Sequence, residues 1–197
     1  MIKIGRRVKN LSRADLNQII PLHQDSLADI GAILGTNYLS RFYNLLFSET
    51  DHTLLGVFEK DKLIGLLAGS FNLPETHLSL RQLLKIREIL LVLVNIFIGK
   101  IDPGRIIQRL QLEKFLFQKM EDNSGGIVIL LVKEDYRRQG IGRLLIEEFL
   151  RRCRKKKIDE VYVDTLESFQ GTLTFYRSLG FSIRTSSGRT HLLSKKI

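Results

Sequence analysis

The sequence has no tryptophan, a single cysteine, three prolines and four scattered histidines. The lone Cys153 excludes an internal disulfide and suits a reducing compartment, so we expect a cytoplasmic protein. The histidines show no metal-ligand spacing, and no metal site is predicted. No apolar run approaches the roughly 20 residues that cross a bilayer. No signal peptide is expected, because the stretch Met1–Val8 is charged and has no apolar segment.

Acidic residues are also scarce relative to basic ones. Against 21 Asp and Glu stand 31 Lys and Arg, a net charge of +10. Such an excess suits an anionic partner. The densest basic cluster, residues 151–157, ends a predicted helix, where cations complement the helix dipole. It carries no interleaved aromatics and no nucleic-acid-binding motif, so no nucleic-acid partner is expected.

The chain of 197 residues, 44% of them hydrophobic, is long enough for one domain, residues 1–197, with a sizeable core. Its N-terminal part predicts strands over Ile2–Val8, Thr53–Glu59 and Leu63–Phe71, the last two joined by a tight Lys60-Asp61 turn. Gly65 and Gly69 inside the third strand predict a bulge or a close backbone approach.

Two helical segments are expected between the first two strands. A helix is expected to begin at Ser12, with Asp15 as a capping-box partner, and Pro21 and Gly31 predict breaks or a short second helix. Tyr38, Leu39, Phe42, Leu45 and Leu46 form the apolar stripe of the next helix.

Residues 73–123 predict a helical hairpin inserted between strands three and four. The apolar run Ile89–Ile98 belongs to its first helix, and Asp102-Pro103 begins its second. Three interpretations compete for the run: packing on the sheet, a dimer contact or lid, and contact with a membrane surface assisted by flanking basic residues.

The most informative stretch is Gly126–Leu150. The apolar run Ile127–Val132 indicates a buried strand, and helical spacing follows from Ile141. Between them lies Arg137-x-x-Gly140-x-Gly142. The first N–H groups of a helix lack internal partners, and glycines allow an anion to approach them, so a phosphate ligand is predicted. The Walker pattern does not match, because it requires Ser or Thr where the chain has Leu144. The dinucleotide-binding pattern does not match either, because it requires a third glycine where the chain has Leu145.

This motif resembles the acyl-CoA-binding motif of the GNAT superfamily of N-acyltransferases. A second segment, Phe175-Tyr176-x-x-Leu179-Gly180-Phe181, resembles that family's Phe-Tyr-x-x-Leu-Gly-Phe segment, with a plausible strand at Val161–Val163 between the two. The detailed resemblance covers Gly126 to Phe181. It implies an α/β (α+β) fold with a mixed, mostly antiparallel sheet that is splayed between strands 4 and 5 and flanked by helices.

The resemblance also implies site residues. Acetyl-CoA would be the cosubstrate, and its pantetheine arm would lie along Leu130, Leu131 and Val132. Its pyrophosphate would contact a loop that carries most of the predicted cofactor residues: Arg137, Arg138, Gln139, Gly140, Ile141, Gly142 and Arg143. Tyr176 matches the position of the family's usual general acid; its structural alternative is a core tyrosine.

One position departs from the family pattern. Phe169 stands where the family often carries an asparagine that contacts the cofactor arm, and Ser168 or Gln170 could replace it. Ser168 is also a candidate helix N-cap in a loop over Thr165–Gly171. The general base is not identified: Asp164, Glu167, Glu134, Asp135 and a water chain all remain open. Cys153 is predicted to be packed, not nucleophilic.

The leading hypothesis is therefore an acetyl-CoA-dependent N-acetyltransferase acting on a primary amine of a small molecule by a ternary-complex mechanism. The insertion favours a bulky acceptor such as an amino sugar. The alternatives are acetylation of a protein or peptide amine and a non-catalytic CoA-binding module that engages a protein or membrane partner. The insertion could also serve a membrane-surface contact or a homodimer.

Overall fold

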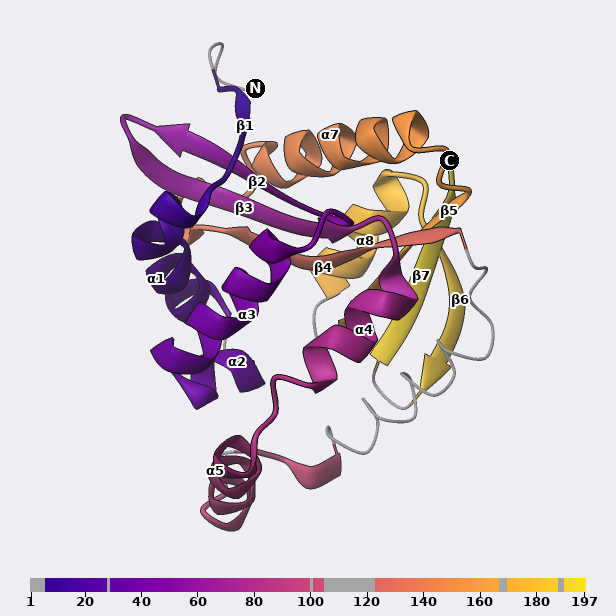
Figure 1. Cartoon of the computed structure of the whole chain (residues 1–197). Coiled ribbons are helices and arrows are strands. Elements are labelled where there is room, and N and C mark those ends of the chain that lie inside the picture. Colours follow the sequence, from indigo (N-terminus) through magenta and orange to yellow (C-terminus); the bar gives the residue numbers. More distant parts are fainter. Residues whose placement is uncertain (1–5, 28, 100, 105–122, 167–169, 188–189) are drawn as a thin grey trace.

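In the computed structural model, a single seven-stranded sheet carries helices on both faces (Figure 1). The structure describes residues 6–27, 29–99, 101–104, 123–166, 170–187 and 190–197. The strands are β1 (Val8–Asn10), β2 (His52–Glu59), β3 (Lys62–Ser70), β4 (Ser124–Val132), β5 (Glu160–Leu166), β6 (Ser182–Ser187) and β7 (Thr190–Lys196). The helices are α1 (Leu16–Ser26), α2 (Ile30–Leu34), α3 (Thr36–Ser48), α4 (Leu73–Arg81), α5 (Ile86–Phe97), α7 (Ile141–Lys155) and α8 (Gln170–Ser178).

The strand order is β1-β2-β3-β4-β5-β7-β6. Every neighbouring pair is antiparallel except β4 and β5, which are parallel. The prediction of a mixed, mostly antiparallel sheet flanked by helices is confirmed.

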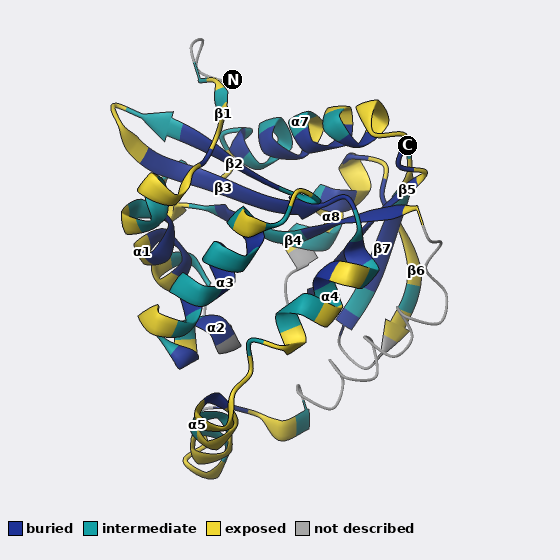
Figure 2. Cartoon of the chain, in the orientation of Figure 1, coloured by how far each residue is buried: buried dark blue, intermediate teal, exposed yellow. Residues whose placement is uncertain are grey.

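Alternating side chains of β2 and β3 divide the core into two layers. Leu55 and Leu67 pack in one cluster with the inner face of α7, whereas Leu54 and Leu66 pack in the other with α1 and α3. Successive strand residues point to opposite faces, which makes this division a direct consequence of the sequence pattern. Figure 2 shows the result as a buried sheet between partly exposed helices.

The β2–β3 hairpin is as predicted. Lys60 and Asp61 both take positive φ, +46° and +63°, as a two-residue hairpin turn requires. The close approach predicted at Gly65 and Gly69 is also present. A Cβ on Gly65 would lie 2.5 Å from Ile141, and one on Gly69 would lie 2.3 Å from Phe149. These two glycines allow α7 to lie directly on β3.

Three N-terminal boundaries differ from prediction. Of the strand expected over Ile2–Val8, residues 1–5 lie outside the described residues, and β1 begins only at Val8. Pro21 does not break the helix; it lies inside α1, which continues to Ser26. The capping box of Ser12 and Asp15 is present, but it opens the 3-10 turn Arg13–Asp15 that leads into α1.

Between β3 and β4, the chain forms two helices where one was expected up to Ile98. Asn72 caps α4, and an extended Lys85 separates it from α5. The helix expected from Pro103 is seen at residues 103–104, and its remainder lies outside the described residues. α5 does not pack on the sheet: it contacts α2, and only Glu88 is buried along it. The interpretation of Ile89–Ile98 as enlarged core is therefore wrong. None of the described helices is long and apolar enough to cross a membrane.

Candidate active site

The candidate site begins where β4 and β5 separate. The two strands pair at Ser124, Gly125 and Gly126 only, opposite residues 160–162. Beyond these pairs, β4 continues alongside β3, and β5 continues alongside β7. No pairing joins β4 to β5 past Gly126 in the described part of the chain. The splay predicted between strands 4 and 5 is present, and it leaves two strand edges facing each other.

The three β4 residues predicted to contact the pantetheine arm lie on this open stretch. Leu131 is 3% exposed and packs in the α1–α3 layer. Leu130 and Val132 are half-buried and pack against the α7–α8 layer. The backbone of β4 is therefore held between two packed layers, so that its edge has a fixed position.

A left-handed turn leads from β4 into α7. Arg138 and Gly140 take positive φ, +61° and +83°, and Gly140 is the N-cap of α7. Gly140 suits this position because it has no Cβ to strain the backbone. Ile141 is buried against Gly65, which fixes the first turn of the helix on the sheet.

Gly142 lies in the first turn of α7 between the two motifs. A Cβ at this position would be 3.2 Å from Cζ of Phe175 and 3.8 Å from Leu130. A larger residue would push into the contact between α7 and α8. The absence of a side chain at Gly142 therefore lets the first turn of α7 lie close against α8.

Two polar side chains of this loop form hydrogen bonds with backbone carbonyl groups, whereas Arg138 is exposed to solvent. Arg137 donates from Nε to the Val132 carbonyl at 3.2 Å and from a terminal nitrogen to the Ser26 carbonyl at 3.5 Å. Gln139 donates to the Asp135 carbonyl at 3.0 Å. These two residues tie the loop to β4, α1 and its own preceding turn. The backbone N–H groups at the start of α7 and the exposed side chain of Arg138 remain the candidates for contacts with an anion.

Arg143 joins α7 to α8. Its guanidinium donates to Ser178 Oγ at 3.1 Å and lies 3.6 Å from the Glu147 carboxylate. Ser178 in turn donates to the Phe175 carbonyl at 2.7 Å. The two motifs that were far apart in the sequence are thus in direct contact.

Tyr176 lies on α8 and is 4% exposed. Its ring packs against Phe175 and, edge-on, against Phe181, with centroid separations of 5.3 and 5.6 Å. Burial, and then the negative charge of Asp164, raise the pKa of Tyr176 far above its ordinary value. The hydroxyl therefore carries its proton throughout the physiological range. Such a group can act as a proton donor but not as a base.

The other residues that the sequence singled out lie partly inside and partly outside the described structure. Ser168, Phe169 and Glu167 lie outside the described residues. Glu134 and Asp135 are exposed in a short turn, Glu134–Tyr136, before the motif. β5 extends to Leu166, so the loop expected from Thr165 begins later. Burial raises the pKa of the Cys153 thiol to about 12, which supports the prediction that it is packed and unreactive.

Sequence reasoning missed a network beneath the loop. Arg6, with a side chain only 6% exposed, donates to Glu59 at 2.8 Å and to Gln139 at 3.1 Å. Tyr136 donates to the other oxygen of Glu59 at 2.8 Å, and Arg6 lies over its ring. The Nε of Arg6 is buried and makes no hydrogen bond within the described structure. No local signal reveals this network, because its members are 53 to 133 residues apart.

A second missed network holds the helical layer together. The buried ring of His23 lies 2.8 Å from the Tyr43 hydroxyl and 3.1 Å from the Asp29 carboxylate. Asp29 also caps α2 by accepting from Ala32 N–H at 2.8 Å. Burial raises the pKa of Tyr43. One histidine thereby links α1, α2 and α3. No cluster of metal-ligating side chains is present among the described residues.

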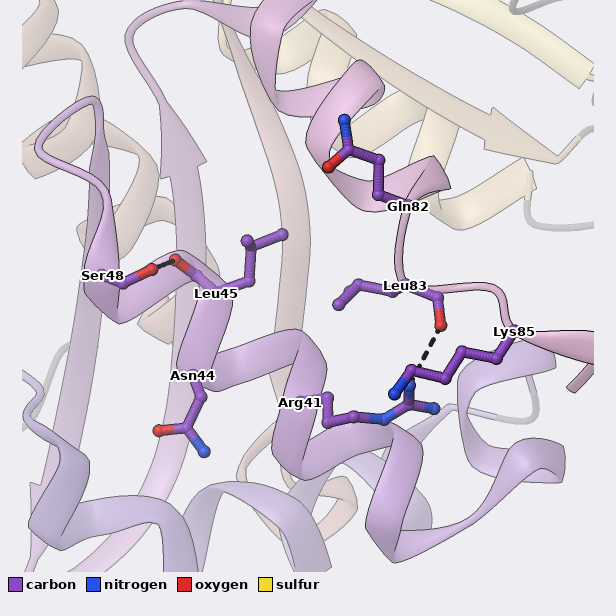
Figure 3. Close-up of a pocket in the computed structure, with 7 residues that line it drawn as sticks. All are labelled: Arg41, Asn44, Leu45, Ser48, Gln82, Leu83 and Lys85. Carbon is purple, nitrogen blue, oxygen red and sulfur yellow. Dashed lines mark hydrogen bonds between the residues drawn. The ribbon is translucent and has the colours of Figure 1, made fainter. Parts of the chain in front are cut away.

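An open cavity of about 440 Å³ lies away from the loop, between α3 and the connection from α4 to α5 (Figure 3). It is lined by Arg41, Asn44, Leu45, Ser48, Gln82, Leu83 and Lys85. None of the predicted cofactor residues lines it, so the cavity is separate from the N-terminus of α7.

Comparisons with known proteins agree with this geometry. Residues 96–181 match the model of the acetyltransferase (GNAT) family, a range that contains both motifs. No curated protein matches the sequence. Several solved structures share the fold over almost the whole chain at low identity.

One similar structure is the PaiA N-acetyltransferase from Thermoplasma acidophilum in complex with coenzyme A. It is 16% identical, with a TM-score of 0.65, and the match covers 98% of this chain and 100% of that one. The ribosomal-protein-S18-alanine N-acetyltransferase from Escherichia coli is 14% identical, with a TM-score of 0.61 and coverage of 98% and 94%. An acetyltransferase from Thermus thermophilus is 13% identical, with a TM-score of 0.64 and full coverage of both chains.

Proposed function

We propose that this chain, whose residues 96–181 match the model of the acetyltransferase (GNAT) family, is an acetyl-CoA-dependent N-acetyltransferase. It acetylates a primary amine of a small molecule directly, in a ternary complex. The observation that carries this proposal is the splay of β4 from β5 beside the N-terminus of α7, which Gly140 caps. The two unpaired strand edges can form hydrogen bonds with the extended pantetheine arm of acetyl-CoA. The free N–H groups at the start of α7 can bind its pyrophosphate.

The residues that would hold acetyl-CoA follow from this geometry. Backbone groups of Leu130 and Val132 would pair with the pantetheine arm, with Leu131 between them supporting the strand. The pyrophosphate would contact the N–H groups from Gly140 to Arg143, with the Arg138 side chain adding charge. Arg137 and Gln139 would hold the loop in place through their backbone contacts. Ser168 stays a prediction for a contact with the arm.

Acetyl-CoA would supply the thioester, whose acyl carbon forms a bond to the neutral amine nitrogen as its bond to sulfur breaks. The nitrogen then loses one proton to water, one of the bases that the sequence leaves open. The fixed edge of β4 would donate an N–H to the thioester carbonyl and stabilise negative charge on its oxygen. Tyr176 would give its proton to the departing sulfur, and its raised pKa keeps the hydroxyl protonated at neutral pH. Proximity in the ternary complex supplies much of the rate.

The insertion between β3 and β4 favours a bulky acceptor such as an amino sugar. A second candidate acceptor is a protein or peptide amine, favoured by the similarity to the ribosomal-protein-S18-alanine N-acetyltransferase. An acceptor screen distinguishes the two candidates. The protein is incubated with acetyl-CoA and with amine metabolites or peptides, and mass spectrometry detects the mass of an added acetyl group. Acetylation of peptides alone would refute the small-molecule proposal.

The cofactor site has its own test. Acetyl-CoA should raise the melting temperature of the protein, because a ligand that binds only the folded state stabilises it. Gly142→Trp should abolish this shift, because a large side chain there would push α8 away from the first turn of α7. Gly171→Trp is the control, since no atom lies within 4 Å of a Cβ at Gly171. A shift that survives Gly142→Trp would place the cofactor elsewhere.

A further inference from the structure

The helix α5 presents an apolar face to solvent. Its outward stripe, which we call the α5 stripe, repeats every three or four residues along one face. The members are between 49% and 91% exposed: Ile86, Ile89, Leu90, Leu93, Val94 and Phe97. Figure 2 shows α5 as a largely exposed helix at the periphery of the molecule, beyond α2. Contiguous apolar faces of this kind mark interaction sites in water-soluble proteins.

The opposite side of α5 is fixed to the body. Glu88 is 5% exposed and forms an ion pair with Arg41 of α3. Arg41 also donates to the Leu83 carbonyl at 3.3 Å, just before the helix begins. These contacts fix the rotation of α5 about its own axis. The α5 stripe therefore points outward as a consequence of the fold.

The surroundings of the stripe are basic. From Leu80 to Ile101 the chain contains four cations, Arg81, Lys85, Arg87 and Lys100, and one acid, Glu88. That acid is already paired with Arg41. The cavity at the start of α5 is lined by Arg41 and Lys85 and by no acidic residue. Figure 3 shows these two side chains reaching toward the same space.

We propose that α5 docks the protein on an anionic lipid bilayer, with the α5 stripe in the outer acyl region and Lys85 and Arg87 at the headgroups. A helix of 12 residues is about 18 Å long, which suits a helix lying in the plane of the interface rather than crossing an apolar core of about 30 Å. Each cation near an anionic surface adds attraction.

The composition of the stripe favours lipid over a protein partner. All six members are aliphatic or phenylalanine, with no hydrogen-bonding group among them. Protein interfaces favour tyrosine, tryptophan and arginine at their centres. A second copy of the chain is also disfavoured, because a stable dimer uses roughly 20–30 residues a side. Lipid requires only apolarity with a cationic border.

The test is flotation of the full chain with vesicles of phosphatidylcholine alone or mixed with phosphatidylglycerol. We expect flotation with the anionic vesicles, weakened by salt. The double variant Leu93→Gln/Phe97→Gln should reduce the bound fraction at least tenfold. The matched control Leu78→Gln/Ile183→Gln changes two other exposed apolar residues and should bind like the original chain.

Two further variants test the contribution of basic side chains to vesicle binding. Lys85→Gln/Arg87→Gln should reduce binding to the level seen with neutral vesicles, whereas the exposed pair Arg13→Gln/Lys62→Gln should not. An unchanged acetyl-CoA melting shift shows that each variant is folded. Flotation requires no acetyl transfer, so this result is independent of the acceptor.

Three results would overturn the proposal. The first is no flotation with anionic vesicles. The second is equal flotation of the original chain and the Leu93→Gln/Phe97→Gln variant, which would leave only general electrostatic attraction. The third is a concentration-dependent dimer that the same variant abolishes without any vesicle binding, because α5 would then contact a second copy.

Discussion

Two properties of Tyr176 fit both a structural tyrosine of the core and a general acid. It is buried among aromatic rings, and its pKa is raised by that burial. Burial alone explains its presence, whereas its place in the second motif beside the cofactor helix points to proton donation. Only a kinetic measurement separates these roles, because removal of the hydroxyl leaves the ring packing unchanged.

We expect Tyr176→Phe to lower kcat by roughly 10²-fold, the lower range for general acid catalysis. The KM for acetyl-CoA and the melting temperature should change little, because the ring remains. Tyr162→Phe is the control: Tyr162 is also 4% exposed, but its hydroxyl donates to Glu160 at 2.6 Å within the sheet. Steady-state kinetics with a thiol reagent gives both constants. An unchanged kcat would leave Tyr176 as a core residue only.

Glu148 gives a residue-scale prediction about acid stability. It accepts hydrogen bonds from Arg151 at 2.7 Å and from Arg152 at 2.9 Å. The bond from Arg151 leads the causes that lower the pKa of Glu148 to about 2. A lowered carboxylate pKa stabilises the fold above the unfolded value of about 4.5, and this stabilisation is lost as pH falls toward 2.

We expect Glu148→Gln to remove about 1 kcal/mol of stability at pH 7 and almost none at pH 2. The full shift would correspond to about 3 kcal/mol at 1.36 kcal/mol per unit, but Arg151 is half exposed and solvent screens the pair. Glu147→Gln is the matched neighbour, since Glu147 is more exposed and lies 3.6 Å from Arg143. Urea unfolding from pH 7 to pH 2 measures the difference. Equal losses at both pH values would contradict the ion-pair origin.

At the scale of elements, the loop before α7 depends on a segment from the opposite end of the sequence. Arg6 precedes β1 and joins Glu59 at the end of β2 to Gln139 in the loop. The loop thereby acquires a support that none of its own residues provides. Supporting contacts of this kind position the groups that touch a ligand.

We expect Arg6→Gln to weaken acetyl-CoA binding by roughly tenfold, or about 1.4 kcal/mol. The link from Gln139 through Arg6 to Glu59 would be lost, and the N–H groups at the start of α7 would be held less firmly in one arrangement. Arg7→Gln is the control, because Arg7 is the adjacent, exposed arginine. Calorimetric titration with acetyl-CoA measures both. Equal weakening in the two variants would indicate a general effect of charge.

Elements with strong local signals were predictable, and those set by distant contacts were not. The Lys60-Asp61 turn, Gly140 at the start of α7 and the glycines beneath it follow from backbone geometry, which single residues reveal. Pro21 was misread because the rest of α1 packs well enough to offset its missing N–H. The apolar run of α5 looked like core, because hydrophobicity alone does not say which surface will cover it. The Arg6 network was not predictable, since an ion pair across 53 residues and a hydrogen bond across 133 leave no local pattern.

At the scale of the whole molecule, the sheet consists of two parts that share little pairing. β1 to β4 form one part, β5 to β7 form the other, and three register pairs join them. The core cluster beneath α7 spans both parts, from Leu55 and Leu67 to Val161 and Leu193. Packing therefore holds the parts together where hydrogen bonds do not. A ligand in the gap would add the missing bonds.

This arrangement predicts where the ligand should change backbone dynamics. On addition of acetyl-CoA, we expect slower amide hydrogen exchange in β4 after Gly126, in β5 after Tyr162 and in the first turn of α7. β1 and the β2–β3 turn should be unchanged, since they lie away from the gap. Gly142→Trp is the control, because the same concentration of acetyl-CoA should protect nothing in it. Protection of α7 without β4 and β5 would mean that the phosphates bind at the helix but the arm does not enter the gap, and direct transfer at β4 would then be untenable.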